Sequence, residues 1–194
     1  MLANPPLKKI SCIPLLLCLS ACGESTMHSK SYQRLIDDPR SSFSRTIDQF
    51  RIHVLINDTY EQIVDCDSLF CDSSGRRGPP YTLVISTSFY GETVDTVAIH
   101  EVTLQIGPDA PIMLHSADDE PIGRSFEPWL DHAVKANYRI PLDEQLSFVA
   151  GEEVTVTVRF QPPESTETQT ITTVFQGKKK SVSTSKLMTL LQGS

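Results

Sequence analysis

The stretch VTVTVRF, residues 154–160, alternates apolar and polar side chains without a break. In an extended chain, Val154, Val156, Val158 and Phe160 fall on one face, and the threonines and Arg159 fall on the other. This period of two predicts an antiparallel strand with one face buried and one face in water.

The same period recurs on both sides of this stretch. It predicts further strands at residues 50–56, 81–89, 94–107, 138–142, 171–175 and 181–187. Pro141 confines its strand to a sheet edge, and the residues QGKK at 176–179 predict a hairpin turn between the last two strands. We therefore expect residues 46–194 to form a mainly β domain, an immunoglobulin-like antiparallel β-sandwich, with a small β-barrel as the alternative.

One short helix is expected within this domain, in the stretch SFEPWLDHAVKAN at 125–137. Ser125 or Glu127 would begin it, and Pro128 suits the first turn. Trp129, Leu130, Ala133 and Val134 would form its apolar side.

The buried face changes parity within residues 97–106. Val97 and Ile99 occupy odd positions, whereas Val102, Leu104 and Ile106 occupy even ones. A one-residue slip of this kind predicts a β-bulge at His100-Glu101. Bulges are enriched beside functional sites, but a bend between two sheets is the interpretation that we favour.

Residues 1–21 precede the domain and have the layout of an export signal. Lys8 and Lys9 are followed by an apolar run from Ile10 to Leu19, which is too short to span a membrane as a helix. The tetrapeptide Leu19-Ser20-Ala21-Cys22 then resembles the lipobox of bacterial lipoproteins. The resemblance implies removal of residues 1–21, attachment of lipid to Cys22 and a membrane anchor made of several acyl chains.

Residue Gly23 bears on the destination of such a lipoprotein. Inner-membrane lipoproteins of enteric-type bacteria commonly carry Asp at this position, so the resemblance favours the outer membrane, facing the periplasm. Residues 22–45 are rich in Ser and polar overall, and we expect them to be the lipidated cysteine and a flexible tether, with one helical turn around Tyr32 to Asp37.

The five cysteines divide into three groups. Cys12 and Cys18 would leave with the signal, and Cys22 would carry lipid. Cys66 and Cys71 remain, and in an exported protein they are expected to form a disulfide. Its small loop would contribute about 2 kcal/mol. The alternative is a metal site with the neighbouring aspartates, for which the spacing is a weak signal.

Other candidate ligands are few. Met113 and His115 are two residues apart, so they would share a strand face, and with His100 they could bind a soft metal such as copper. Ordinary surface or core roles are the favoured interpretation, and no cofactor is expected. The acidic run at 118–120 lacks the pattern of a calcium loop and predicts a solvated turn.

Charge and motifs narrow the function. The net charge of -7 becomes about -9 without Lys8 and Lys9, which argues against nucleic acid as a partner. The sequence has no nucleophile elbow, zinc-protease helix or phosphate loop, so we do not expect an enzyme. We expect a lipid-anchored module that binds another envelope protein. The alternative is a carrier of a small ligand or metal ion.

Overall fold

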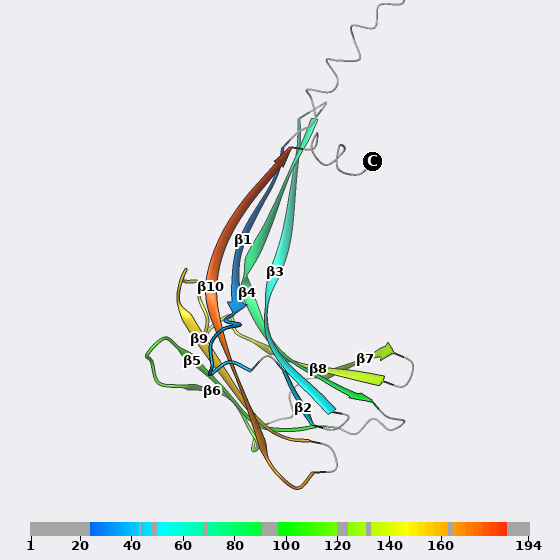
Figure 1. Ribbon diagram of the computed structural model, residues 1–194. Helices are drawn as coiled ribbons and strands as arrows, with labels where there is room; N and C mark the ends of the chain where they lie inside the picture. The colour runs from blue at the N-terminus through cyan, green and yellow to red at the C-terminus, as the bar shows by residue number, and fades with distance from the viewer. Residues whose placement is uncertain are drawn as a thin grey trace, which may run out of the picture. The chain divides into compact units, whose positions relative to one another are not determined.

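A computed structural model describes residues 24–42, 44–47, 50–67, 70–90, 97–119, 124–130, 133–162 and 165–185 (Figure 1). At 24, 65–67, 70–72, 89–90, 124–130, 133–135 and 184–185 the description covers the backbone alone. These residues are mainly β, as expected, and contain no helix. The strands are β1 (Glu24–Arg34), β2 (Ser44–Ile47), β3 (Phe50–Asp67), β4 (Phe70–Tyr90), β5 (Ala98–Ile106), β6 (Ile112–Ser116), β7 (Arg124–Leu130), β8 (Ala133–Pro141), β9 (Glu153–Gln161) and β10 (Gln169–Ser185).

These strands join one open sheet in the order β2-β3-β4-β1-β10-β9-β5-β6, and β8 pairs with β4 and β7 off this path. Each pair with a described register is antiparallel. The pairing does not divide the strands into the two sheets that we expected for a sandwich. The strand that contains Pro141, β8, is not an edge strand, because β4 and β7 flank it. Pro141 itself has no partner in β7, since Tyr138 is the last residue of β8 that pairs with that strand.

The chain divides into two compact units, and β1, β3, β4 and β10 contribute to both. The larger unit is Ser29–Tyr60 with Arg77–Lys180. The smaller unit is Met1–His28, Glu61–Arg76 and Ser181–Ser194, of which the structure describes 24–28, 61–67, 70–76 and 181–185.

The hydrophobic core lies in the larger unit. The four apolar residues of VTVTVRF are fully buried in β9, as the alternation predicts. Strands that are not neighbours in the sheet share this core. The ring centroids of Phe50 in β3 and Phe160 in β9 are 5.8 Å apart. The Tyr138 hydroxyl of β8 donates a hydrogen bond to the Val97 carbonyl, just before β5. The sheet therefore curves around one apolar interior, where each large side chain contributes about 1.5–3 kcal/mol.

The bulge predicted in β5 is present. In the pairing of β5 with β9, Ile99 lies opposite Phe160 and Glu101 lies opposite Arg159, so His100 is the extra residue. Beyond it, Val102 and Leu104 are fully buried. The one-residue slip keeps apolar side chains on the core side after the parity changes.

The predicted short helix is wrong. Residues 124–130 and 133–141 form β7 and β8, paired from Arg124 opposite Tyr138 to Leu130 opposite Ala133. An isolated helix of this length is marginal because nucleation is costly. A hairpin instead gains a full ladder of hydrogen bonds to β4, which pairs with β8 from Thr82 to Tyr90.

The segment that we expected to be a tether contains a strand. Residues 24–34 form β1 between β4 and β10, and the Tyr32 side chain belongs to the core. The next residues are also attached to the sheet, since the Ser42 N–H donates to the Thr172 carbonyl at 2.7 Å. Composition alone hides this strand, because a central strand can be polar along most of its length when its backbone groups are paired on both sides.

The predicted hairpin turn at 176–179 is also wrong, because β10 runs without a break from Gln169 to Ser185. Gly177 is needed for close packing instead. Its N–H donates to the Glu152 carbonyl, its carbonyl accepts from the Gly151 N–H, and a Cβ at this position would lie 2.2 Å from the Val149 carbonyl oxygen. A glycine within a strand can mark such an approach as well as a turn.

Gly177→Ala is expected to lower the free energy of unfolding by about 1–3 kcal/mol, because the backbone at Val149 must move away from the new methyl group. Urea unfolding of the purified protein measures this. Gly78→Ala is the control, since its Cβ would meet the Lys30 Cβ at 3.7 Å and the Lys30 carbonyl oxygen at 4.0 Å, both ordinary van der Waals contacts. Equal effects of the two variants would contradict the close approach at Gly177.

Candidate functional site

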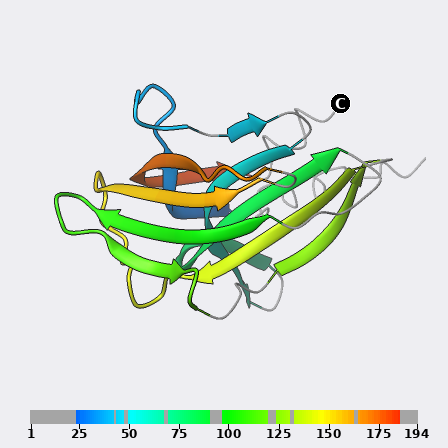
Figure 2. The ribbon, with the colours of Figure 1, turned by 90° about the horizontal axis from the view of Figure 1, so that it is seen from below.

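The residues singled out as candidate ligands lie on β5 and β6, at one end of the sheet. β9 pairs with one side of β5, and β6 pairs with the other (Figure 2). In the described part of the chain, β6 has β5 as its single strand partner. Ile112 and Met113 in β6 are exposed large apolar side chains. This end of the sheet thus combines an outer strand with exposed apolar side chains.

The bulge places Glu101 in an ion pair. Its carboxylate lies 3.1 Å from the guanidinium of Arg159 on β9, and both side chains are substantially exposed. Exposed pairs of this kind contribute about 0–1 kcal/mol. His100, the extra residue, is half-buried. The geometry favours a structural bend at this position. The Glu101 carboxylate is already paired with the Arg159 guanidinium.

Met113 and His115 do not share a face, and that expectation is wrong. Met113 pairs with Thr103 and His115 pairs with Val102, so Leu114 is an extra residue in β6. Because Val102 and Thr103 are consecutive, their partners lie on opposite faces of the sheet. His115 is accordingly buried, with its Nδ1 3.9 Å from a carboxylate oxygen of Asp119, whereas Met113 is 54% exposed.

No group of three or more His, Cys, Asp or Glu side chains is arranged to hold a metal ion within the described residues. Cys22 lies outside them. Cys66 and Cys71 have described backbones in β3 and β4, but their side chains also lie outside the described part, as do those of the neighbouring aspartates.

The acidic run forms a turn after β6, as expected for the residues described there. The Asp119 carboxylate accepts from the Ser116 N–H at 2.6 Å, and the Asp119 N–H donates to the Ser116 carbonyl. Asp118 and Asp119 are exposed to solvent.

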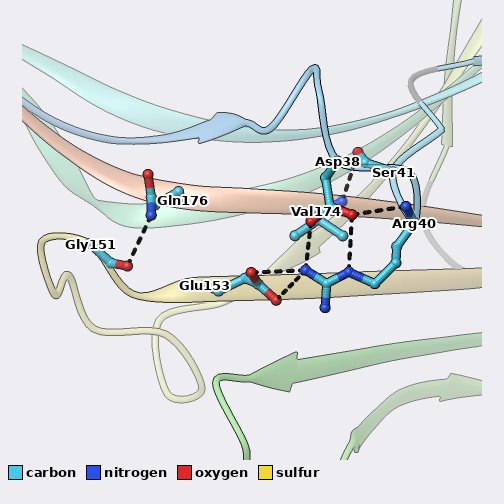
Figure 3. Close-up of polar contacts among 7 residues, drawn as sticks. All are labelled: Asp38, Arg40, Ser41, Gly151, Glu153, Val174 and Gln176. Carbon is cyan, nitrogen blue, oxygen red and sulfur yellow. Dashed lines mark hydrogen bonds and ion pairs between the residues drawn. The ribbon is translucent and has the colours of Figure 1, made fainter.

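An ion-pair cluster that the sequence did not reveal joins the segment after β1 to β9 (Figure 3). The guanidinium of Arg40 lies 2.5 Å from the Asp38 carboxylate and 3.0 Å from that of Glu153. Hydrogen bonds from Arg40 hold the pKa of Asp38 below its ordinary value. Beside this cluster, the Ser41 hydroxyl accepts from the Val174 N–H, and the Gln176 amide donates to the Gly151 carbonyl. The contacts of Arg40 with Glu153, Ser41 with Val174 and Gln176 with Gly151 each join one segment to another, which indicates a structural role for the cluster.

Tyr32 and Tyr81 are two buried tyrosines with raised pKa values. Their rings meet edge to face with centroids 5.3 Å apart, and burial raises the pKa of each to about 12. The Tyr32 hydroxyl donates to the Ser147 carbonyl at 2.9 Å and to the Glu152 carboxylate at 3.2 Å, and the Tyr81 hydroxyl donates to the Lys30 carbonyl. Perturbed pKa values often mark active sites, but these hydroxyls fasten β1 and the loop before β9 to the core.

A serine and a histidine contact each other on the smaller unit. The Ser181 hydroxyl of β10 lies 3.0 Å from Nδ1 of His28 on β1. No carboxylate contacts His28 in the described part, so the pair lacks the group that orients the histidine in a catalytic triad.

No protein-family model, curated protein or solved structure matches the chain. Among the described residues, no helix has the length and apolar character needed to cross a membrane.

Tyr32→Phe is expected to lower the free energy of unfolding by about 1–3 kcal/mol at neutral pH, because it removes hydrogen bonds to Ser147 and Glu152. In the parent protein the folded-state pKa is raised, so the contribution of Tyr32 is complete below pH 10 and is lost as the pH rises toward 12. The variant should therefore lose less stability over that interval. Urea unfolding at several pH values tests this, and parallel pH profiles for the two proteins would contradict it.

Proposed function

We propose that this chain is a lipid-anchored protein of the bacterial cell envelope that works without catalysis, by binding another envelope protein. Two features support the proposal. The lipobox-like tetrapeptide ending in Cys22 supports the anchor, and the outer strand β6 supports binding. The outer membrane, on its periplasmic side, is the proposed location because Gly23 follows Cys22.

One observation carries the binding proposal: β6 is an outer strand and also exposes large apolar side chains. An outer strand presents backbone N–H and C=O groups that can pair with an added strand. Ile112 and Met113 are exposed on this same strand, and charged residues, which protect many edges, are absent from it. A partner segment in extended form could extend the sheet at β6 and cover both side chains.

We also propose that Cys66 and Cys71 form a disulfide. β3 ends at Asp67 and β4 begins at Phe70, so each cysteine lies one residue inside its strand, at equal distances from the connection. Directly opposed residues of antiparallel strands have Cα atoms about 4.5–5.5 Å apart, which is within the range of a disulfide.

A ligand or metal carrier, the alternative expected from the sequence, has less support. It relied on Met113 and His115 sharing a face with each other, and the extra residue Leu114 separates them. We therefore place the binding surface on the strand edge and exposed apolar side chains of β6.

Photo-crosslinking in living cells tests the binding proposal. A photoreactive phenylalanine analogue at Met113 is expected to yield a crosslinked adduct of one defined size, and Ile112→Lys should remove that adduct, because a charge on the outer strand opposes strand addition. The analogue at Ile36, which is 75% exposed in a turn, is the control and should yield none. Absence of an adduct at Met113, or the same adducts from both positions, would refute binding through β6.

A further inference from the structure

The smaller unit brings strands from both ends of the chain together. Among its described residues, the hydroxyls of Ser25 in β1 and Ser73 in β4 are 3.4 Å apart, and His28 in β1 contacts Ser181 in β10. These contacts attach the first residues of β1 to β4 and β10. We call the described residues of this unit, 24–28, 61–67, 70–76 and 181–185, the anchor ribbon.

The covalent chain leaves little freedom between the anchor ribbon and Cys22. β1 begins at Glu24, so Gly23 is the one residue between the proposed lipidation site and the strand. Two successive Cα–Cα steps span at most about 7.6 Å. If Cys22 carries acyl chains that lie in a bilayer, the start of β1 must lie at the level of the lipid headgroups.

The anchor ribbon has exposed apolar side chains on both faces. Ile63 and Val64 are consecutive residues of β3, so they point to opposite faces, and both are about half exposed. A single flat protein surface could cover one of them but not both. A lipid interface that surrounds the ribbon could cover both.

A second apolar pair lies on β1 and β10. The Leu35 N–H donates to the Val174 carbonyl, and His28 contacts Ser181. Both contacts fit a single antiparallel register of β1 and β10. This register places Met27 beside Val182, and both are exposed, at 42% and 39%. Partly exposed apolar pairs of this kind are stabilised when a partner removes them from water.

The charged residues of the anchor ribbon itself are mainly acidic: Glu24, Glu61, Asp65, Asp67 and Asp72, against Arg76. Lys178, Lys179 and Lys180 are exposed and immediately precede Ser181 in β10. Near an anionic leaflet, each lysine contributes about 1 kcal/mol of attraction. The acidic residues of the ribbon oppose this attraction, so burial of the exposed apolar side chains must drive its contact with lipid.

We propose that the anchor ribbon lies in the headgroup region of the membrane that holds the Cys22 lipid, with Met27, Ile63, Val64 and Val182 against the acyl chains. This inference rests on the proposed lipid anchor. The occupant of the exposed apolar surface is the lipid bilayer.

Fluorescence quenching tests the proposal on the full-length lipidated protein. The protein is reconstituted into vesicles of phosphatidylethanolamine and phosphatidylglycerol with and without brominated acyl chains. Met27→Trp is expected to lose roughly half of its added emission to the bromines, because interfacial apolar side chains lie about 5–10 Å into the headgroup and acyl boundary. Val182→Trp is a second reporter and should behave in the same way.

Leu55→Trp is the matched control, because Leu55 is similarly exposed, at 36%, on the part of β3 that belongs to the larger unit. It should not be quenched, and the parent chain with Trp129 alone gives the background. Unquenched emission from both reporters would overturn the proposal, because the ribbon would then lie away from the acyl chains. Equal quenching of reporters and control would overturn it as well, because it indicates adhesion of the whole surface.

The Cys22→Ser variant separates this inference from the proposed anchor. It should lack the acyl mass and leave the membrane fraction of cells. If it does so while the reporters in the lipidated chain stay unquenched, the anchor stands and the ribbon proposal fails. If the parent chain itself carries no lipid on Cys22, the anchor fails and the ribbon proposal fails with it.

Discussion

The structure depends on β1 being held between β4 and β10. This strand comes first in the described chain, yet it lies in the middle of the sheet, and the last strand, β10, is its neighbour. Pairing with a strand on each side satisfies the backbone N–H and C=O groups of β1, a segment with few apolar side chains. The Tyr32 hydroxyl then reaches Ser147 and Glu152, which draws the loop before β9 onto the core. Removing β1 would leave two unpaired edges in the centre of the sheet.

This central place of β1 changes the physical picture of anchoring. A flexible tether would allow the folded part to move freely above a membrane. If Cys22 carries lipid as proposed, one residue separates it in the sequence from the strand that begins at Glu24. Both β3 and β4 contribute to the same smaller unit as the start of β1, so a lipid on Cys22 would hold several strands near the bilayer. The outer strand β6 belongs to the larger unit.

Strict alternation was the most reliable guide that the sequence offered. Val154 to Phe160 predicted both the strand and its buried face, and the change of parity at His100 predicted the bulge, because burial of one sheet face imposes a period of two. The failures arise where pairing overrides composition. Ser125 to Val134 has helical spacing but joins a hairpin, and Gly177 serves close backbone packing where it suggested a turn. The candidate ligands Met113 and His115 were misplaced because an extra residue between them, Leu114 in β6, leaves no signal in a two-residue spacing.

Hydrogen–deuterium exchange of the β1 amides tests the central claim most directly. If β1 is a central strand, the amides of Ser29 to Arg34 should exchange as slowly as those of β9 and β10, because they are hydrogen-bonded within the sheet and open with it. Exchange of these amides at the rate of an unstructured peptide, while β9 and β10 stay protected, would contradict the account and restore the tether.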